Sequence, residues 1–263
     1  MGSNWSWPCG ERERRRYRVT TNKPRAFKRP ENNEEAFLDT APFQVSLTRG
    51  PRLDRTLRMS LGDHTPSYVV AHPSSLEEAI VILQLPSEVS TFEPVPGTYF
   101  VLNFSLSGDS TEQWCEMLEN NLQNANEVGQ TFIGSAADSS GGFYFCFFKP
   151  DDQVASESRI LVKPLNQEMS ARSLREFLNE QSEFFFRGCI AYQGEHLLVF
   201  EEFFIPKSLS YYVVEIPSGD VDDLGYREKL ARRIEKCVTK QSLDFTALVS
   251  TRRSLYLVLS MQE

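Results

Sequence analysis

The sequence has no apolar run long enough to span a membrane as a helix. No window approaches the roughly 18 consecutive apolar residues that such a helix requires, and the N-terminus lacks the apolar core of a secretory signal peptide. Cysteine is also scarce: the five residues are an odd number, lie far apart and include no CxxC pair. We therefore expect a reduced, cytosolic protein in which cysteine packs as a small hydrophobic residue.

Histidine is scarcer still, with three residues in the chain, and no known catalytic motif accompanies them. Cys189 and His196 fall in neighbouring strands of one expected hairpin, where a nucleophile and its base could meet. A buried structural cysteine beside a turn histidine is the interpretation we favour. Glu201 and Glu202 are adjacent on one expected strand, so their side chains point to opposite faces and cannot share a metal ion. The sequence thus predicts no catalytic residue, no metal and no cofactor.

Charge is distributed unevenly along the chain. Residues 1–30 carry nine Lys/Arg against two Glu, whereas residues 61–263 carry 15 Lys/Arg against 29 Asp/Glu. Residues 1–40 are too polar to bury the apolar surface that would offset their ordering entropy, so we expect a disordered arm. A basic arm on an acidic body is typical of segments that bind the phosphates of lipids or nucleic acids.

Residues 41–263 predict an α+β body of mostly antiparallel sheet with packed helices. Its first part, residues 41–95, contains three segments that we expect to be strands, "FQVSLTR", "TLRMSLG" and "SYVVAH". These are followed by "SSLEEAIVILQL", for which we expect a short helix. Ser74 and Glu77 have the spacing of a capping box at its start.

The second part, residues 96–263, shows the order strand–helix–strand–strand three times. The units start near Tyr99, Arg159 and Tyr211. In the first expected helix, Trp114 and Leu118 begin an apolar stripe at four-residue spacing, which must pack against the neighbouring strands. Short links between the last two strands of each unit predict antiparallel hairpins. We expect the units to share one core, because a single unit buries too little apolar surface to be stable alone.

The first nine residues carry the pattern for an N-terminal lipid anchor. Gly2 and Ser6 match M-G-x-x-x-[ST], the signal for N-myristoylation. One myristoyl chain gives only marginal membrane binding, so a second signal is required. Cys9 could be palmitoylated, and Trp5 and Trp7 have the amphipathic rings that favour the membrane interface. The remaining signal is a basic run that suits an anionic leaflet: Arg12, Arg14, Arg15, Arg16, Arg18, Lys23, Arg25, Lys28 and Arg29.

A second basic patch is expected on the last helix of the body, within "LGYREKLARRIEKCVTKQ". It comprises Arg227, Arg232, Arg233 and Lys236, with Lys229 and Lys240 nearby. A solvated helix face explains this patch, and so does a second contact for an anionic surface.

Two functions follow from the arm. The first is a non-enzymatic adaptor or scaffold at the cytosolic face of a membrane, with anionic lipids bound by the arm and an unidentified protein partner bound by the body. The leader is similar in architecture to those of myristoylated viral accessory and matrix proteins, although no motif of the body extends this resemblance. The alternative, also compatible with a viral protein, is RNA binding by the arginine-rich arm.

Overall fold

The structure, a computed structural model, describes the body in segments. The described residues are 43–49, 57, 65–71, 78–84, 96–137, 142–152, 158–165, 168–202, 209–217, 219, 223–241, 243–251 and 253–262. The elements follow in the order β1 (Phe43–Arg49), β2 (Thr65–Ala71), β3 (Glu78–Gln84), β4 (Gly97–Phe104), α2 (Thr111–Glu127), β5 (Thr131–Ala137), β6 (Phe143–Pro150), β7 (Ile160–Pro164), α3 (Ala171–Glu180), β8 (Phe184–Tyr192), β9 (Glu195–Glu202), β10 (Leu209–Pro217), α4 (Leu224–Gln241), β11 (Asp244–Ser250) and β12 (Ser254–Gln262).

Four consecutive units of three strands build the body, and in each unit the third strand lies between the first and the second. We call the first strand of a unit its outer strand, the second its inner strand and the third its middle strand. Pairing within every unit is antiparallel. The expected α+β class is therefore confirmed, and the three expected strand–helix–strand–strand units are the second, third and fourth units of the structure.

The first unit corrects two of the sequence predictions. The segment expected to be a helix contains the strand β3, and its apolar run from Ala79 to Leu83 is buried. Such a run suits a middle strand that is covered on both faces, and β-branched Ile80, Val81 and Ile82 favour the extended conformation. Conversely, Leu57 lies in a segment expected to be a strand, yet it is helical and buried. Ser74 and Glu77, the expected capping pair, lie outside the described residues.

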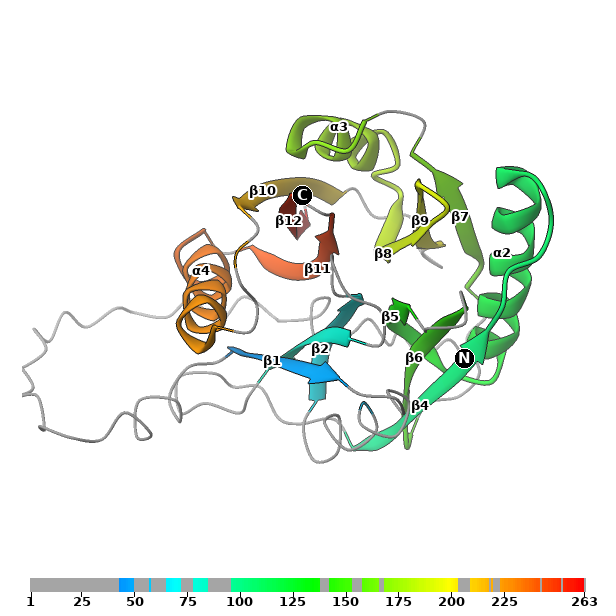
Figure 1. Ribbon diagram of the computed structural model, residues 1–263, viewed down its shortest axis with the longest axis horizontal. Helices are drawn as coiled ribbons and strands as arrows, with labels where there is room; N and C mark the ends of the chain where they lie inside the picture. Colours follow the sequence, from blue (N-terminus) through cyan, green and yellow to red (C-terminus); the bar gives the residue numbers. More distant parts are fainter. Residues whose placement is uncertain are drawn as a thin grey trace, which may run out of the picture.

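The four units close into a ring around their inner strands. β2 contacts β5, β5 contacts β8, β8 contacts β11, and β11 contacts β2. Helices α2, α3 and α4 lie on the outside of the ring (Figure 1). Each of them packs on the outer strand of the next unit: α2 on β7, α3 on β10 and α4 on β1. The last helix thus covers the first strand and closes the ring.

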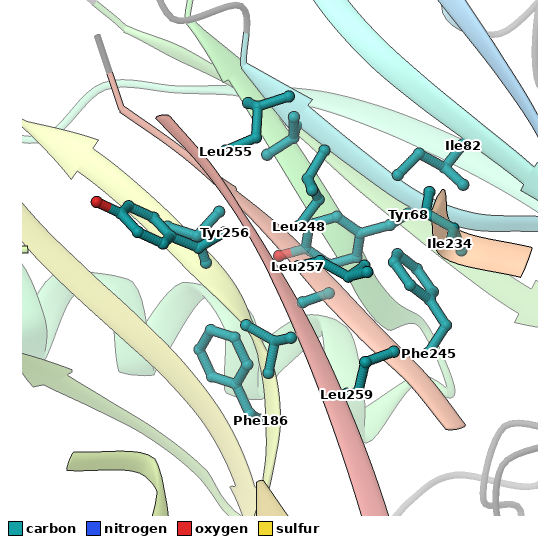
Figure 2. Close-up of a cluster of buried hydrophobic side chains, with 14 of the residues drawn as sticks. Tyr68, Ile82, Phe186, Ile234, Phe245, Leu248, Leu255, Tyr256, Leu257 and Leu259 are labelled. Carbon is teal, nitrogen blue, oxygen red and sulfur yellow. The ribbon is translucent and has the colours of Figure 1, made fainter. Parts of the chain in front are cut away.

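Each inner strand has a register shift near its start, immediately before Tyr68, Gly134, Gly188 or Ala247. These four residues are one large side chain and three small ones. The ring of Tyr68 lies among Leu248, Leu257 and other apolar side chains of the core (Figure 2). A Cβ at Gly188 would lie 1.6 Å from the Tyr68 hydroxyl oxygen. Gly188 therefore leaves the space that the tyrosine hydroxyl occupies.

The outer strands are protected by polar side chains as well as by packing. Glu119 and Gln123 of α2 accept hydrogen bonds from two alternate backbone N–H groups of β7, both at 2.8 Å. Asn179 of α3 accepts from the N–H of Tyr211 in β10 at 2.8 Å and donates to its carbonyl at 3.1 Å. An uncovered edge strand would present these groups to other chains. The helices satisfy them instead.

Candidate functional site: a cationic stripe on α4

Most residues of the expected lipid-binding site lie outside the described part of the chain. These are Gly2, Cys9, the two tryptophans and the nine basic residues of the arm. The patch expected on the last helix of the body lies within it. The site is therefore built from α4.

Helix α4 separates its apolar residues from its cations by helical spacing. Leu230, Ile234 and Cys237 are buried with the core. Four cations at spacings of three and four residues are exposed on the other side, and we call them the α4 stripe: Lys229, Arg232, Arg233 and Lys236. With a rise of 1.5 Å per residue, the stripe extends over about 10 Å.

Arg227, which the sequence analysis grouped with these cations, does not belong to the stripe. Its side chain is half-buried, and its Nε atom is buried without a hydrogen bond among the described residues. The spacing explains this position, because Arg227 is two residues from Lys229 and such residues do not share a helix face. The same rule places Lys229 in the stripe, and it could have been applied to the sequence.

The stripe is only weakly neutralised by its own helix. Arg232 lies 3.8 Å from Glu228, and both side chains are substantially exposed. An exposed pair of this kind contributes little to stability and leaves the cation open to other anions. Within the described part of the chain, the structure shows no ion pair for Lys229, Arg233 or Lys236. The stripe thus presents a net positive charge to solvent.

The helix on the opposite side of the ring has the opposite charge. α2 contains four glutamates and no lysine or arginine. Glu112, Glu116 and Glu127 are exposed, whereas Glu119 bonds to β7. α2 belongs to the second unit and α4 to the fourth, and they lie on opposite sides of the ring (Figure 1). The two helices therefore present opposite charges on opposite sides of the ring.

The cysteine–histidine pair lacks the electrostatics of a nucleophilic site. Cys189 and His196 both lie in the β8–β9 hairpin, where Cys189 is opposite Leu198 and His196 is opposite Ala191. Burial raises the pKa of the Cys189 thiol to about 12. Burial also lowers the pKa of His196, a shift that Glu195 partly opposes. A reactive cysteine requires the reverse, a lowered thiol pKa beside a cation.

A partly buried polar network joins the second and third units. Asn126 of α2 donates to the carbonyl and the hydroxyl oxygens of Ser158, at 2.9 and 3.0 Å. The Ser158 hydroxyl donates to Glu201, which accepts from Nε of Arg187 at 2.6 Å. Every charged member has a partner, and we assign the network a structural role. No sequence pattern indicated this network, because its members come from α2, the segment before β7, β8 and β9.

Two features are absent from the described residues. No helix among them combines the length and the apolar character needed to cross a membrane. No group of three or more histidine, cysteine or acidic side chains among them is arranged to hold a metal ion.

Comparison of the chain with protein-family models, with curated proteins and with solved structures finds no significant match.

Proposed function

We propose that this protein is a non-enzymatic adaptor that is held at the cytosolic face of a membrane by its N-terminal arm. Myristoylation of Gly2 and the basic residues of the arm supply the two signals that stable anchoring needs. Palmitoylation of Cys9 would strengthen the anchor. The ring of four units is the body that the arm presents to a protein partner.

The observation that carries this proposal is the segregation of positive charge. Nine of the cations lie in residues 1–30, directly after the acylation motif, while the body from residue 61 onward is acidic. Each basic residue close to an anionic leaflet contributes about 1 kcal/mol, and this contribution is screened by salt. An acidic body would be repelled by the same leaflet, except where the α4 stripe faces it.

RNA binding is the competing function, and the arginines of the arm suit it equally well. It leaves Gly2, Ser6, Cys9 and the two tryptophans without a role. Lipid anchoring uses all of them together. We therefore favour the membrane over nucleic acid as the target of the arm.

The test is the variant Gly2→Ala in the full-length chain, produced in eukaryotic cells. The substitution removes the residue whose amino group accepts the acyl chain, so the variant should move from the membrane fraction to the supernatant. Gly10→Ala is the matched control, because it makes the same change within the arm and leaves the acylation pattern intact. The intact mass of the N-terminal peptide should show the myristoyl group in the parent and the control, and not in Gly2→Ala.

Membrane fractionation that is identical for Gly2→Ala and Gly10→Ala would refute lipid anchoring. An unmodified N-terminal peptide in the parent would refute it as well. If RNA competes for the parent protein far better than anionic vesicles do, nucleic-acid binding replaces the proposal.

A further inference from the structure

The arm joins the body beside α4. Phe43 is the first residue of β1, the strand on which α4 packs. Its ring lies 6.1 Å from that of Phe245, and both belong to the core cluster that includes Ile234 of α4. The start of β1 and α4 are also adjacent in Figure 1. Whatever surface the arm binds, α4 is the helix nearest to the point of attachment.

The arm is long enough for its cations and the α4 stripe to contact one plane. Thirteen residues lie between Arg29, the last cation of the arm, and Phe43. Fully extended, this stretch spans at most about 50 Å. The electrostatic potential of an anionic leaflet decays within a Debye length, about 8 Å at physiological salt. Residues exposed on the outer face of α4 can enter this layer without changing the fold.

The negative charge of α2 favours one orientation of the body at an anionic leaflet. With α4 toward an anionic leaflet, its four exposed cations are attracted and the exposed glutamates of α2 are far away. With the body reversed, three exposed glutamates would enter the layer and be repelled.

We propose that the α4 stripe is the membrane-docking surface of the body, and that it turns α2 away from the membrane. This inference rests on the proposed function and adds the orientation of the body and the chemistry of its surface ligand, an anionic bilayer. Docking would fix the orientation of the body relative to the membrane. A protein partner would then meet the side of the ring that carries α2.

The experiment uses the full-length myristoylated protein and vesicles of phosphatidylcholine with or without phosphatidylserine. The test variant replaces Lys229, Arg232, Arg233 and Lys236 by Gln, which preserves helix propensity. The control variant replaces four exposed arginines outside α4 by Gln, with the same change in net charge: Arg159, Arg172, Arg175 and Arg253. Thermal melting of both variants verifies that they fold.

The test variant should bind phosphatidylserine vesicles roughly 10- to 100-fold more weakly than the parent at low salt, and this difference should shrink as salt is added. The control should change much less, and neutral vesicles should not distinguish the proteins. Acetylation of lysines, followed by mass spectrometry, gives a second readout on the parent. Lys229 and Lys236 should be protected on phosphatidylserine vesicles, while Lys149 of β6 should not be.

The docking proposal would be overturned if the test and control variants lost equal affinity for phosphatidylserine vesicles. It would also be overturned if vesicles did not reduce the acetylation of Lys229 and Lys236. The anchor would survive that result, provided that the parent binds vesicles and Gly2→Ala does not. A parent that binds no vesicle refutes the anchor itself. Loss of RNA binding in the test variant, with vesicle binding retained, would assign the stripe to nucleic acid. Loss of salt-sensitive self-association would assign it to the α2 side of a second copy.

Discussion

The junction of β2 and β5 offers a sharp test of the ring, because a glycine is needed there for two separate reasons. Gly134 pairs with Val69 in the parallel contact that joins the first two units. Its φ of 136° lies in a region that L-residues rarely adopt. A Cβ at this position would also lie 1.7 Å from the carbonyl oxygen of Val69, far inside contact distance. Gly134→Ala should therefore strain the backbone and separate the two strands.

Gly194 separates these two effects. It has a φ of 90° in the turn between β8 and β9, and no described atom lies within 4 Å of the Cβ it lacks. Gly194→Ala should cost only the backbone strain, about 1 kcal/mol. Gly134→Ala should cost that strain and the overpacking term as well, about 3 kcal/mol or more in total.

Chemical denaturation of the two variants measures the difference directly. Thermal melting should agree, since about 2 kcal/mol corresponds to roughly 4–8 °C for a body of this size. If both variants lose the same stability, the close approach of β5 to β2 is wrong. The closure of the ring at this junction would then be refuted.

Two further predictions concern buried charge. The side chains of Arg187 and Glu201 are 10% and 15% exposed, so Arg187→Met should cost about 3–5 kcal/mol by leaving Glu201 without its cation. Arg187→Met combined with Glu201→Met should recover much of this loss in chemical denaturation, and a double variant as unstable as the single one would contradict the pairing. Burial lowers the pKa of His196 in the folded state, so the unfolded chain binds the proton more readily below about pH 6.5. The free energy of unfolding should therefore decrease as the pH is lowered through this range. His196→Gln should flatten this part of the pH profile, and an unchanged slope would show that His196 is not responsible.

Most of the fold was predictable from the sequence, because in three of the units the apolar spacing of the helices differs clearly from that of the strands. The stripe that begins at Trp114 and Leu118 has helical spacing, and both residues are buried as expected. In the first unit β1 and β2 were expected as strands, and only the middle strand β3 was missed, for a local reason. In "EAIVILQ" every position from Ala79 to Leu83 is apolar, and such a run does not distinguish a buried strand from a buried helix. The β-branched residues were the signal that could have decided it.

The inner strands held a further signal. "TFIGSAA", "FRGCIAY" and "DFTALVS" each place a glycine or alanine two residues after a phenylalanine, at the register shift. Aligned with "TPSYVVA" of β2, they identify the first unit as a further copy and put Tyr68 where the others are small. The contacts between successive units could not be predicted from the sequence. Gln123 and Asn179 read as ordinary surface amides, and their bonds to β7 and β10 depend on the packing of the next unit.

The candidate site was predictable in part. Helical spacing separates Lys229, Arg232, Arg233 and Lys236 from Arg227, and the structure places them accordingly. The position of α4 beside β1 follows only from ring closure, which joins the two ends of the body. No local pattern encodes that neighbourhood.

Covering the first strand with the last helix has a consequence for synthesis. β1 begins at Phe43 and α4 at Leu224, so most of the body is made before the outer edge of β1 can be covered. Contacts between such distant segments form slowly, and an uncovered edge can pair with other chains in the meantime. A nascent or truncated chain would carry the arm without the docked cationic helix. Only a chain that includes α4 has both, so the proposed two-point attachment to a membrane would distinguish finished proteins from fragments.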